Sequence, residues 1–110
     1  MYRTALQMYK DTEFRHLSNK EITKRLLLSC IADYNDITVR AMPASAVHAQ
    51  QVLMMLSEHL NPHLPNEEFQ SIHNILWKLN YEFNKVTLGD LNMSKEVVDT
   101  LNFLIDILGD

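Results

Sequence analysis

The chain has 110 residues, a net charge of −4 and 46% hydrophobic residues. This length fits one domain spanning residues 1–110, large enough to fold without disulfides or metals. Two glycines and three prolines are too few for the turns of a β-rich fold, so the composition predicts long helices. The acidic balance argues against a broad nucleic-acid-binding face, because such a face needs basic residues to meet phosphates.

The sequence also bears on the compartment. Cys30 is the single cysteine, which excludes an intrachain disulfide and fits a reducing environment. No apolar run approaches the roughly 18 residues of a membrane span, and the N-terminus lacks the apolar stretch of a secretory signal. We therefore expect a cytoplasmic protein that does not insert into membranes.

Residues 1–17 form a weakly amphipathic lead segment. The sequence is compatible with a short helix or with a loose conformation there. Ser18 and Glu21 then make a capping-box pattern that predicts a helix over residues 19–41, and Pro43 prevents its continuation. Asp33 and Asp36 are assigned to the polar side of this helix. Its apolar residues cover more than one side, in two neighbouring stripes with a flank: Leu27, Ile31 and Tyr34; Ile22, Leu26 and Cys30; Leu28 and Ala32.

Three more helices follow. The second is predicted from an N-cap at Ser45 to the break before Asn61, and the third from an N-cap at Asn66 to a left-handed cap at Gly89. Ser94 is the predicted cap of the fourth. Short connections between four helices predict an all-α fold, an antiparallel up-down four-helix bundle.

The sequence contains little evidence for a catalytic or metal-binding site. His59 and His63 have a metal-ligand spacing, but Pro62 lies between them and no further ligand cluster completes a site. Cys30 lies in an apolar run, where a small core residue is the simpler interpretation than a reactive thiol. We expect no enzyme activity, no catalytic or metal-binding residues and no cofactor.

One alternative is DNA binding. Residues 18–28, "SNKEITKRLLL", resemble the scaffold helix of a LuxR-type helix-turn-helix. A turn and a basic recognition helix should follow directly, but Asp33 and Asp36 stand where phosphates would be met. A small helix-turn-helix-type transcriptional regulator therefore stays the runner-up.

A longer resemblance covers most of the chain. From Tyr9, residues 9–31 keep the motif spacing of the FliS family of flagellin-binding export chaperones, with Phe14 and Ser18 on the family's valine and helix cap. The stretches "HAQQVLMMLSEHLN" and "GDLNMSKEVVDTLNFLIDIL" are similar to two later helices of that family. The chain thus resembles a divergent FliS-type flagellar secretion chaperone.

The resemblance implies a function. Such a chaperone would bind the disordered C-terminal segment of flagellin, prevent premature polymerisation and present its client to the flagellar export apparatus, without binding nucleic acid or membrane. A co-chaperone or scaffold with the same fold is a further alternative. The sequence leaves the oligomeric state open, and does not separate groove from core among the candidate client-binding residues: Tyr9, Phe14, Ile22, Leu26, Leu27, Ile31, Gln50, Met54 and Met55.

Overall fold

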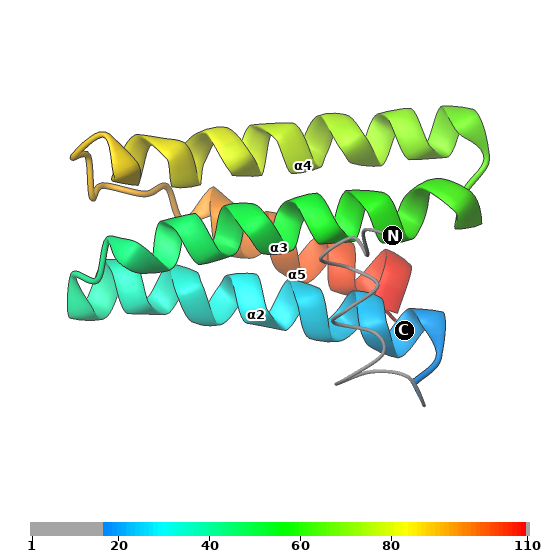
Figure 1. The fold of residues 1–110 in the computed structure, drawn as a ribbon, viewed down its shortest axis with the longest axis horizontal. Helices are drawn as coiled ribbons and strands as arrows, with labels where there is room; N and C mark the ends of the chain where they lie inside the picture. Colours follow the sequence, from blue (N-terminus) through cyan, green and yellow to red (C-terminus); the bar gives the residue numbers. More distant parts are fainter. Residues whose placement is uncertain (1–16, 110) are drawn as a thin grey trace, which may run out of the picture.

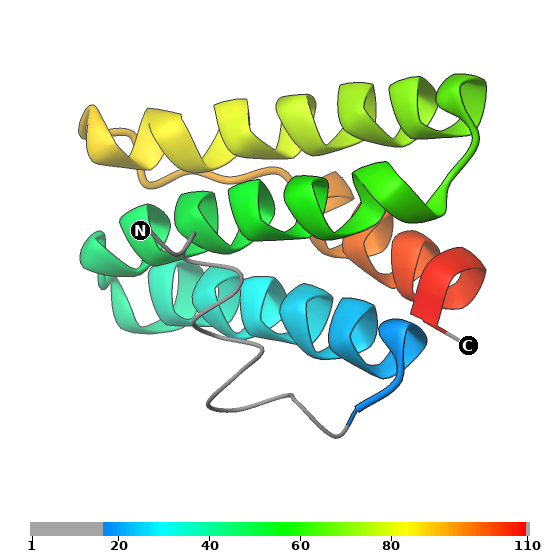
Figure 2. The ribbon, with the colours of Figure 1, turned by 45° about the vertical axis from the view of Figure 1, so that its right-hand side comes forward.

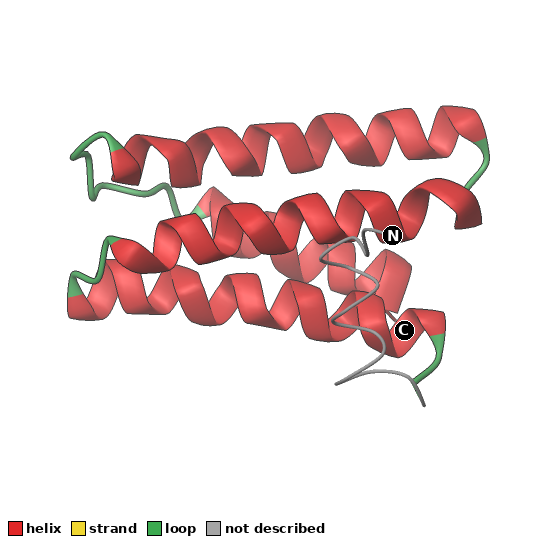
Figure 3. Cartoon of the chain, in the orientation of Figure 1, coloured by secondary structure: helices red, strands yellow, loops and turns green. Residues whose placement is uncertain are grey.

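A computed structural model describes residues 17–109 of the chain. Within them lie four α-helices, a 3-10 turn and a π-helical turn, and no strand (Figure 3). The prediction of an all-α helical bundle is confirmed. Residues 1–16 of the predicted lead segment lie outside the described residues, and Leu17 packs against the core. The elements in chain order are α2 (Asn19–Arg40), α3 (Ala44–Leu60), η2 (Asn61–His63), α4 (Asn66–Thr87), α5 (Glu96–Leu104) and η3 (Ile105–Gly109).

Successive helices run in opposite directions, as expected for an up-down bundle (Figure 1). α4, α3 and α2 lie side by side in that order, because short connections fold each helix back along its predecessor. The connection after α4 then carries the chain behind this row, where α5 and η3 pack against α2 (Figure 2). α4 and α5 make little close backbone contact, so the bundle is open along one seam.

Most predicted helix ends are confirmed. The Ser18 hydroxyl accepts a hydrogen bond from the Glu21 amide at 3.2 Å. The Ser94 hydroxyl accepts from the Glu96 amide at 3.1 Å, although Lys95 lies between Ser94 and the first residue of α5. Gly89 has φ +104° and ends α4 in the left-handed cap that the sequence predicted. α2 ends at Ala41, which has φ +53° although it is not glycine.

Two predicted caps are wrong. α3 begins at Ala44 behind Pro43, which places Ser45 inside the first turn. α4 begins at Asn66 itself, behind Pro65. No side chain caps either start, because proline takes the cap position in both cases and lacks a polar side chain.

The core runs through all four helices. Its largest fully buried side chain is Phe83 of α4, and Cys30 of α2 is also fully buried, as predicted for a small core residue. No helix in the described part of the chain has the length and hydropathy of a membrane span. The other buried apolar residues are Ile22, Leu26, Leu27, Tyr34, Ile37, Ala46, Ala49, Val52, Leu53, Leu56, Leu60, Ile72, Leu76, Leu79, Val86, Val97, Leu101, Leu104 and Ile105.

Candidate functional site

The open seam between α4 and α5 forms a hollow of about 700 Å³. Leu79 of α4 and Val97 of α5 are buried and form its floor. Its rim is formed by three exposed aromatic residues, Trp77, Tyr81 and Phe103. Their exposed fractions are 67%, 62% and 52%. We call this site the aromatic hollow.

Helix geometry explains why these rings are exposed. The core stripe of α4 includes Ile72, Leu76, Leu79 and Phe83, whereas Trp77 and Tyr81, four residues apart, share a different face. Large aromatic side chains bury much surface when they find a partner. A cluster of them around an open hollow is therefore typical of an interaction site.

The charges in the aromatic hollow are balanced. Lys85 forms a salt bridge with Glu82, one turn earlier on α4, and its ammonium group lies 5.7 Å from the centre of the Tyr81 ring. The hydrogen bond to Glu82 raises the pKa of the Lys85 ammonium, so this group stays a cation at neutral pH. Lys78 and Glu96 add one charge of each sign. The hollow thus combines an apolar floor with no net charge.

A second hollow of about 470 Å³ lies farther along the same seam. Ile72, Ile107 and Leu108 supply apolar surface, and Glu67 and Glu68 stand at its edge in the first turn of α4. We call it the acidic hollow. Together the two hollows follow α4 from residue 67 to residue 85, about 27 Å at the helical rise of 1.5 Å per residue. The two hollows share no lining residue, but both lie between α4 and the segment formed by α5 and η3, and we refer to them together as the α4–α5 groove.

The predicted groove residues of α2 belong to the core. Ile22, Leu26 and Leu27 are buried, and Ile31 is half-buried against the same core. The sequence suggested that some of these residues would lie outside the core and line a client-binding groove. In the structure, α2 packs against α3 on one side and against α5 and η3 on another. The two neighbouring stripes therefore pack inside the bundle, whereas Leu28 and Ala32 on the flank are exposed.

The predicted groove residues of α3 are divided. Met55 is half-buried against the core, whereas Met54 is 66% exposed. Met54 and Gln50 line a small hollow of about 200 Å³ between α3 and α4, which also contacts Trp77. The Gln50 amide there donates to Asn84 Oδ1 of α4 at 3.4 Å. Tyr9 and Phe14 lie outside the described residues.

The aromatic rim was not among the predicted site residues. The sequence did carry a signal, since Trp77 and Tyr81 share a flank of α4 and Phe103 lies beside the core stripe of α5. The distance between α4 and α5 could not be predicted from the sequence. The hollow depends on how α5 packs against α2, which brings Phe103 across from the α4 rings without closing the seam.

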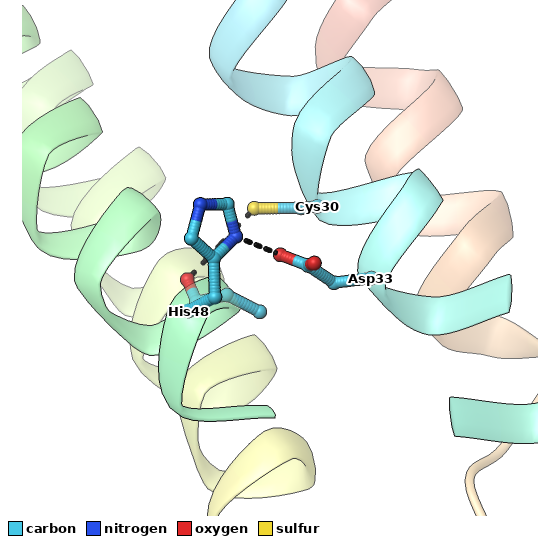
Figure 4. A network of polar contacts seen from close by, with 4 residues as sticks. Cys30, Asp33 and His48 are labelled. Atoms are coloured by element: carbon cyan, nitrogen blue, oxygen red, sulfur yellow. Dashed lines mark hydrogen bonds and ion pairs between the residues drawn. The ribbon is translucent and has the colours of Figure 1, made fainter. Parts of the chain in front are cut away.

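A polar contact joins α2 and α3 at the edge of their interface (Figure 4), where Asp33 is buried and His48 is exposed. Nδ1 of His48 lies 2.7 Å from Oδ2 of Asp33, so the sequence-based assignment of Asp33 to a polar outer side is wrong. Burial raises the pKa of the Asp33 carboxyl, and the hydrogen bond from His48 partly opposes that rise. The carboxyl is tolerated in the interface because His48 gives it a partner.

The Cys30 thiol lies one helical turn before Asp33 and donates to the carbonyl oxygen of Ala49 at 3.9 Å. Burial, together with the charge of Asp33, raises the pKa of this thiol far above its usual range. A buried, protonated thiol is a poor nucleophile. The bond from Cys30 to Ala49 and the contact between Asp33 and His48 are thus two neighbouring polar contacts between α2 and α3.

The two histidines with a metal-ligand spacing lie at the end of α3 and in the turn that follows it. His59 is buried at the end of α3, where its Nε2 lies 3.1 Å from the carbonyl oxygen of Asn19. The His63 ring follows at 5.4 Å between ring centres, in the 3-10 turn η2. The described residues contain no group of three or more His, Cys, Asp or Glu side chains arranged to hold a metal ion.

Comparison of the chain with known protein families, with characterised proteins and with solved structures finds no match. The groove and the sequence resemblance are thus the two observations from which a function can be argued.

Proposed function

We propose that this protein is a non-enzymatic export chaperone of the FliS type, and that it binds an amphipathic helix of its client in the α4–α5 groove. The observation that carries the proposal is the aromatic hollow, where Trp77, Tyr81 and Phe103 stand exposed around a buried apolar floor. The resemblance supplies the client, which is the disordered C-terminal segment of flagellin. It also supplies the setting, which is flagellum assembly in the cytoplasm.

The geometry suits helix-in-groove recognition. An amphipathic client helix can lay residues i, i+3, i+4 and i+7 against the seam, where buried Leu79 and Val97 form the floor. Exposed aromatic residues at the rim are the type that dominates binding energy at interfaces. A segment that is disordered alone would fold as it binds and lose its exposed apolar face. Hiding that face is how such a chaperone would prevent premature polymerisation.

The two alternative functions, a transcriptional regulator and a co-chaperone or scaffold, differ in how well they fit the structure. A helix-turn-helix regulator needs a turn soon after Ser29, but α2 continues unbroken to Arg40, and Asp33 is buried in the bundle. A co-chaperone or scaffold with the same fold could use the same groove for another client. Binding of the flagellin segment separates this last alternative from the proposal.

The proposal is tested by titrating the full chain with the C-terminal peptide of the host's flagellin, using calorimetry and circular dichroism. We expect a Kd of about 1 μM or tighter and a gain of helix on binding. Tyr81→Ala and Phe103→Ala should each weaken binding by about tenfold or more, since a central aromatic contact contributes about 2 kcal/mol. Both side chains are exposed, so the variants should fold normally.

Leu88→Ala is the matched control, because Leu88 is exposed and lines neither hollow. It should bind the peptide as the unmodified chain does. Absence of peptide binding by the unmodified chain would refute the flagellin client. Binding that survives both aromatic substitutions would place the client elsewhere on the molecule.

A further inference from the structure

The α4–α5 groove differs in charge between its two ends. Glu67 and Glu68 lie at the edge of the acidic hollow, and none of the described residues that line it is basic. In the aromatic hollow, Lys78 and Lys85 offset Glu82 and Glu96. Lys24 of α2 approaches Gly109 at the end of η3, but it does not line the acidic hollow. The groove is therefore negative at one end and neutral at the other.

Resting on the proposed function, we propose that the groove selects an amphipathic client helix that carries Lys or Arg at one end, and that it fixes the direction in which the helix lies. The basic end lies over Glu67 and Glu68, and a large apolar residue at the other end enters the aromatic hollow. Tyr81 and Glu68 are 13 positions apart on α4, which corresponds to about 20 Å. The apolar anchor and the basic residues of the client should be separated by a similar distance.

Charge complementarity favours this occupant over a second copy of the chain. The chain carries a net charge of −4, so a copy that brought further acids to Glu67 and Glu68 would be repelled. A client with lysines or arginines at this end makes the opposite contact. Because the two carboxylates are exposed, each pair contributes modestly and is screened by salt. The charges then set direction and selectivity, while the apolar seam supplies most of the affinity.

The test uses two amphipathic peptides of about 18 residues, the number that spans the groove at the helical rise. Both share one apolar face and a large apolar anchor, and they differ only at the far end, which is lysine-rich in one and glutamate-rich in the other. At low salt the lysine peptide should bind the full chain about three- to tenfold more tightly. The double variant Glu67→Lys/Glu68→Lys should reverse this preference.

The control is Glu21→Lys/Asp99→Lys. These acids are also exposed and also lie in first helical turns, so the change in net charge and the loss of favourable helix-dipole contact are matched. This control should keep the preference for the lysine peptide. Circular dichroism should show that both double variants stay folded.

The outcomes are distinct. Equal binding of the two peptides, or a preference that the control variant also loses, would overturn the proposed polarity and leave the groove as a binding site. Binding of neither peptide would count against the groove itself. A stable dimer of the chain that buries Trp77 would overturn the client as occupant, in favour of a second copy.

Discussion

The Asp33 carboxyl is nearly buried between α2 and α3, with His48 as its hydrogen-bond partner. Its pKa lies above the ordinary value because burial disfavours the charged form more than His48 stabilises it. The folded protein therefore keeps this proton to a higher pH than the unfolded chain does. The stability that results is fully present below the ordinary carboxyl pKa, and it is lost as the pH rises through the folded-state pKa.

Substitution of Asp33 by Asn should remove this dependence. The free energy of unfolding of the unmodified chain, relative to Asp33→Asn, should fall as the pH rises from about 4 toward 7. Each pKa unit of difference between the folded and unfolded states corresponds to about 1.4 kcal/mol. Urea denaturation of both proteins across this range measures the effect. A difference that grows with pH would mean that the hydrogen bond to His48 outweighs burial.

At the scale of helices, α2 and α4 are each followed by a residue with positive φ, Ala41 and Gly89. Gly89 has φ +104°, and a side chain there would meet no atom within 4 Å, so the effect of a substitution lies in the backbone alone. Ala41 has φ +53°, a conformation that costs a residue with a Cβ atom about 1 kcal/mol. The N–H groups of Ala41 and Met42 donate to the carbonyls of Ile37 and Asp36 and hold the end of α2 there.

Gly89→Ala should lower the free energy of unfolding by about 1–2 kcal/mol. Ala41→Gly should raise it by up to about 0.5 kcal/mol, because the relief of backbone strain slightly exceeds the entropy that glycine adds to the unfolded chain. Chemical denaturation of the two variants beside the unmodified chain measures both effects. A stabilising Gly89→Ala would show that the α4 end can adopt another cap without loss.

The helices themselves were largely predictable from the sequence. The Ser18 and Ser94 caps and the stop at Gly89 depend on residues within one turn, so local chemistry determines them. The prediction failed at Ser45 and Asn66, which follow a proline by two positions and one position and lie inside the first helical turn instead of capping it. Proline can start a helix without a capping side chain, and the choice between the two starts is not visible in the pattern.

The faces of the helices were harder to predict. Periodicity showed that α2 has two apolar stripes, but it could not say that α3 fills one and that α5 with η3 fills another. For the same reason Leu26 and Leu27 were predicted as groove residues and lie in the core, while Leu28 beside them is exposed. Such assignments need the packing of helices that are distant in the sequence.

At the scale of the whole molecule, the position of α5 determines the candidate site. The connection after α4 brings α5 and η3 against α2 (Figure 2), and the two hollows lie between this segment and α4. The function proposed for the chain thus depends on an incomplete closure of the fold.

Trp77 allows the central claim to be tested directly. It is the single tryptophan of the chain, it stands at the rim of the aromatic hollow, and two thirds of its surface is exposed. Its fluorescence emission can therefore be followed while the unmodified chain is titrated with the flagellin C-terminal peptide. The peptide used must contain no tryptophan, so that all the emission comes from Trp77. If the client helix binds in the groove, the emission shifts to shorter wavelength and saturates with the Kd found by calorimetry. Saturable binding by calorimetry with no change in Trp77 emission would contradict the groove as the client site.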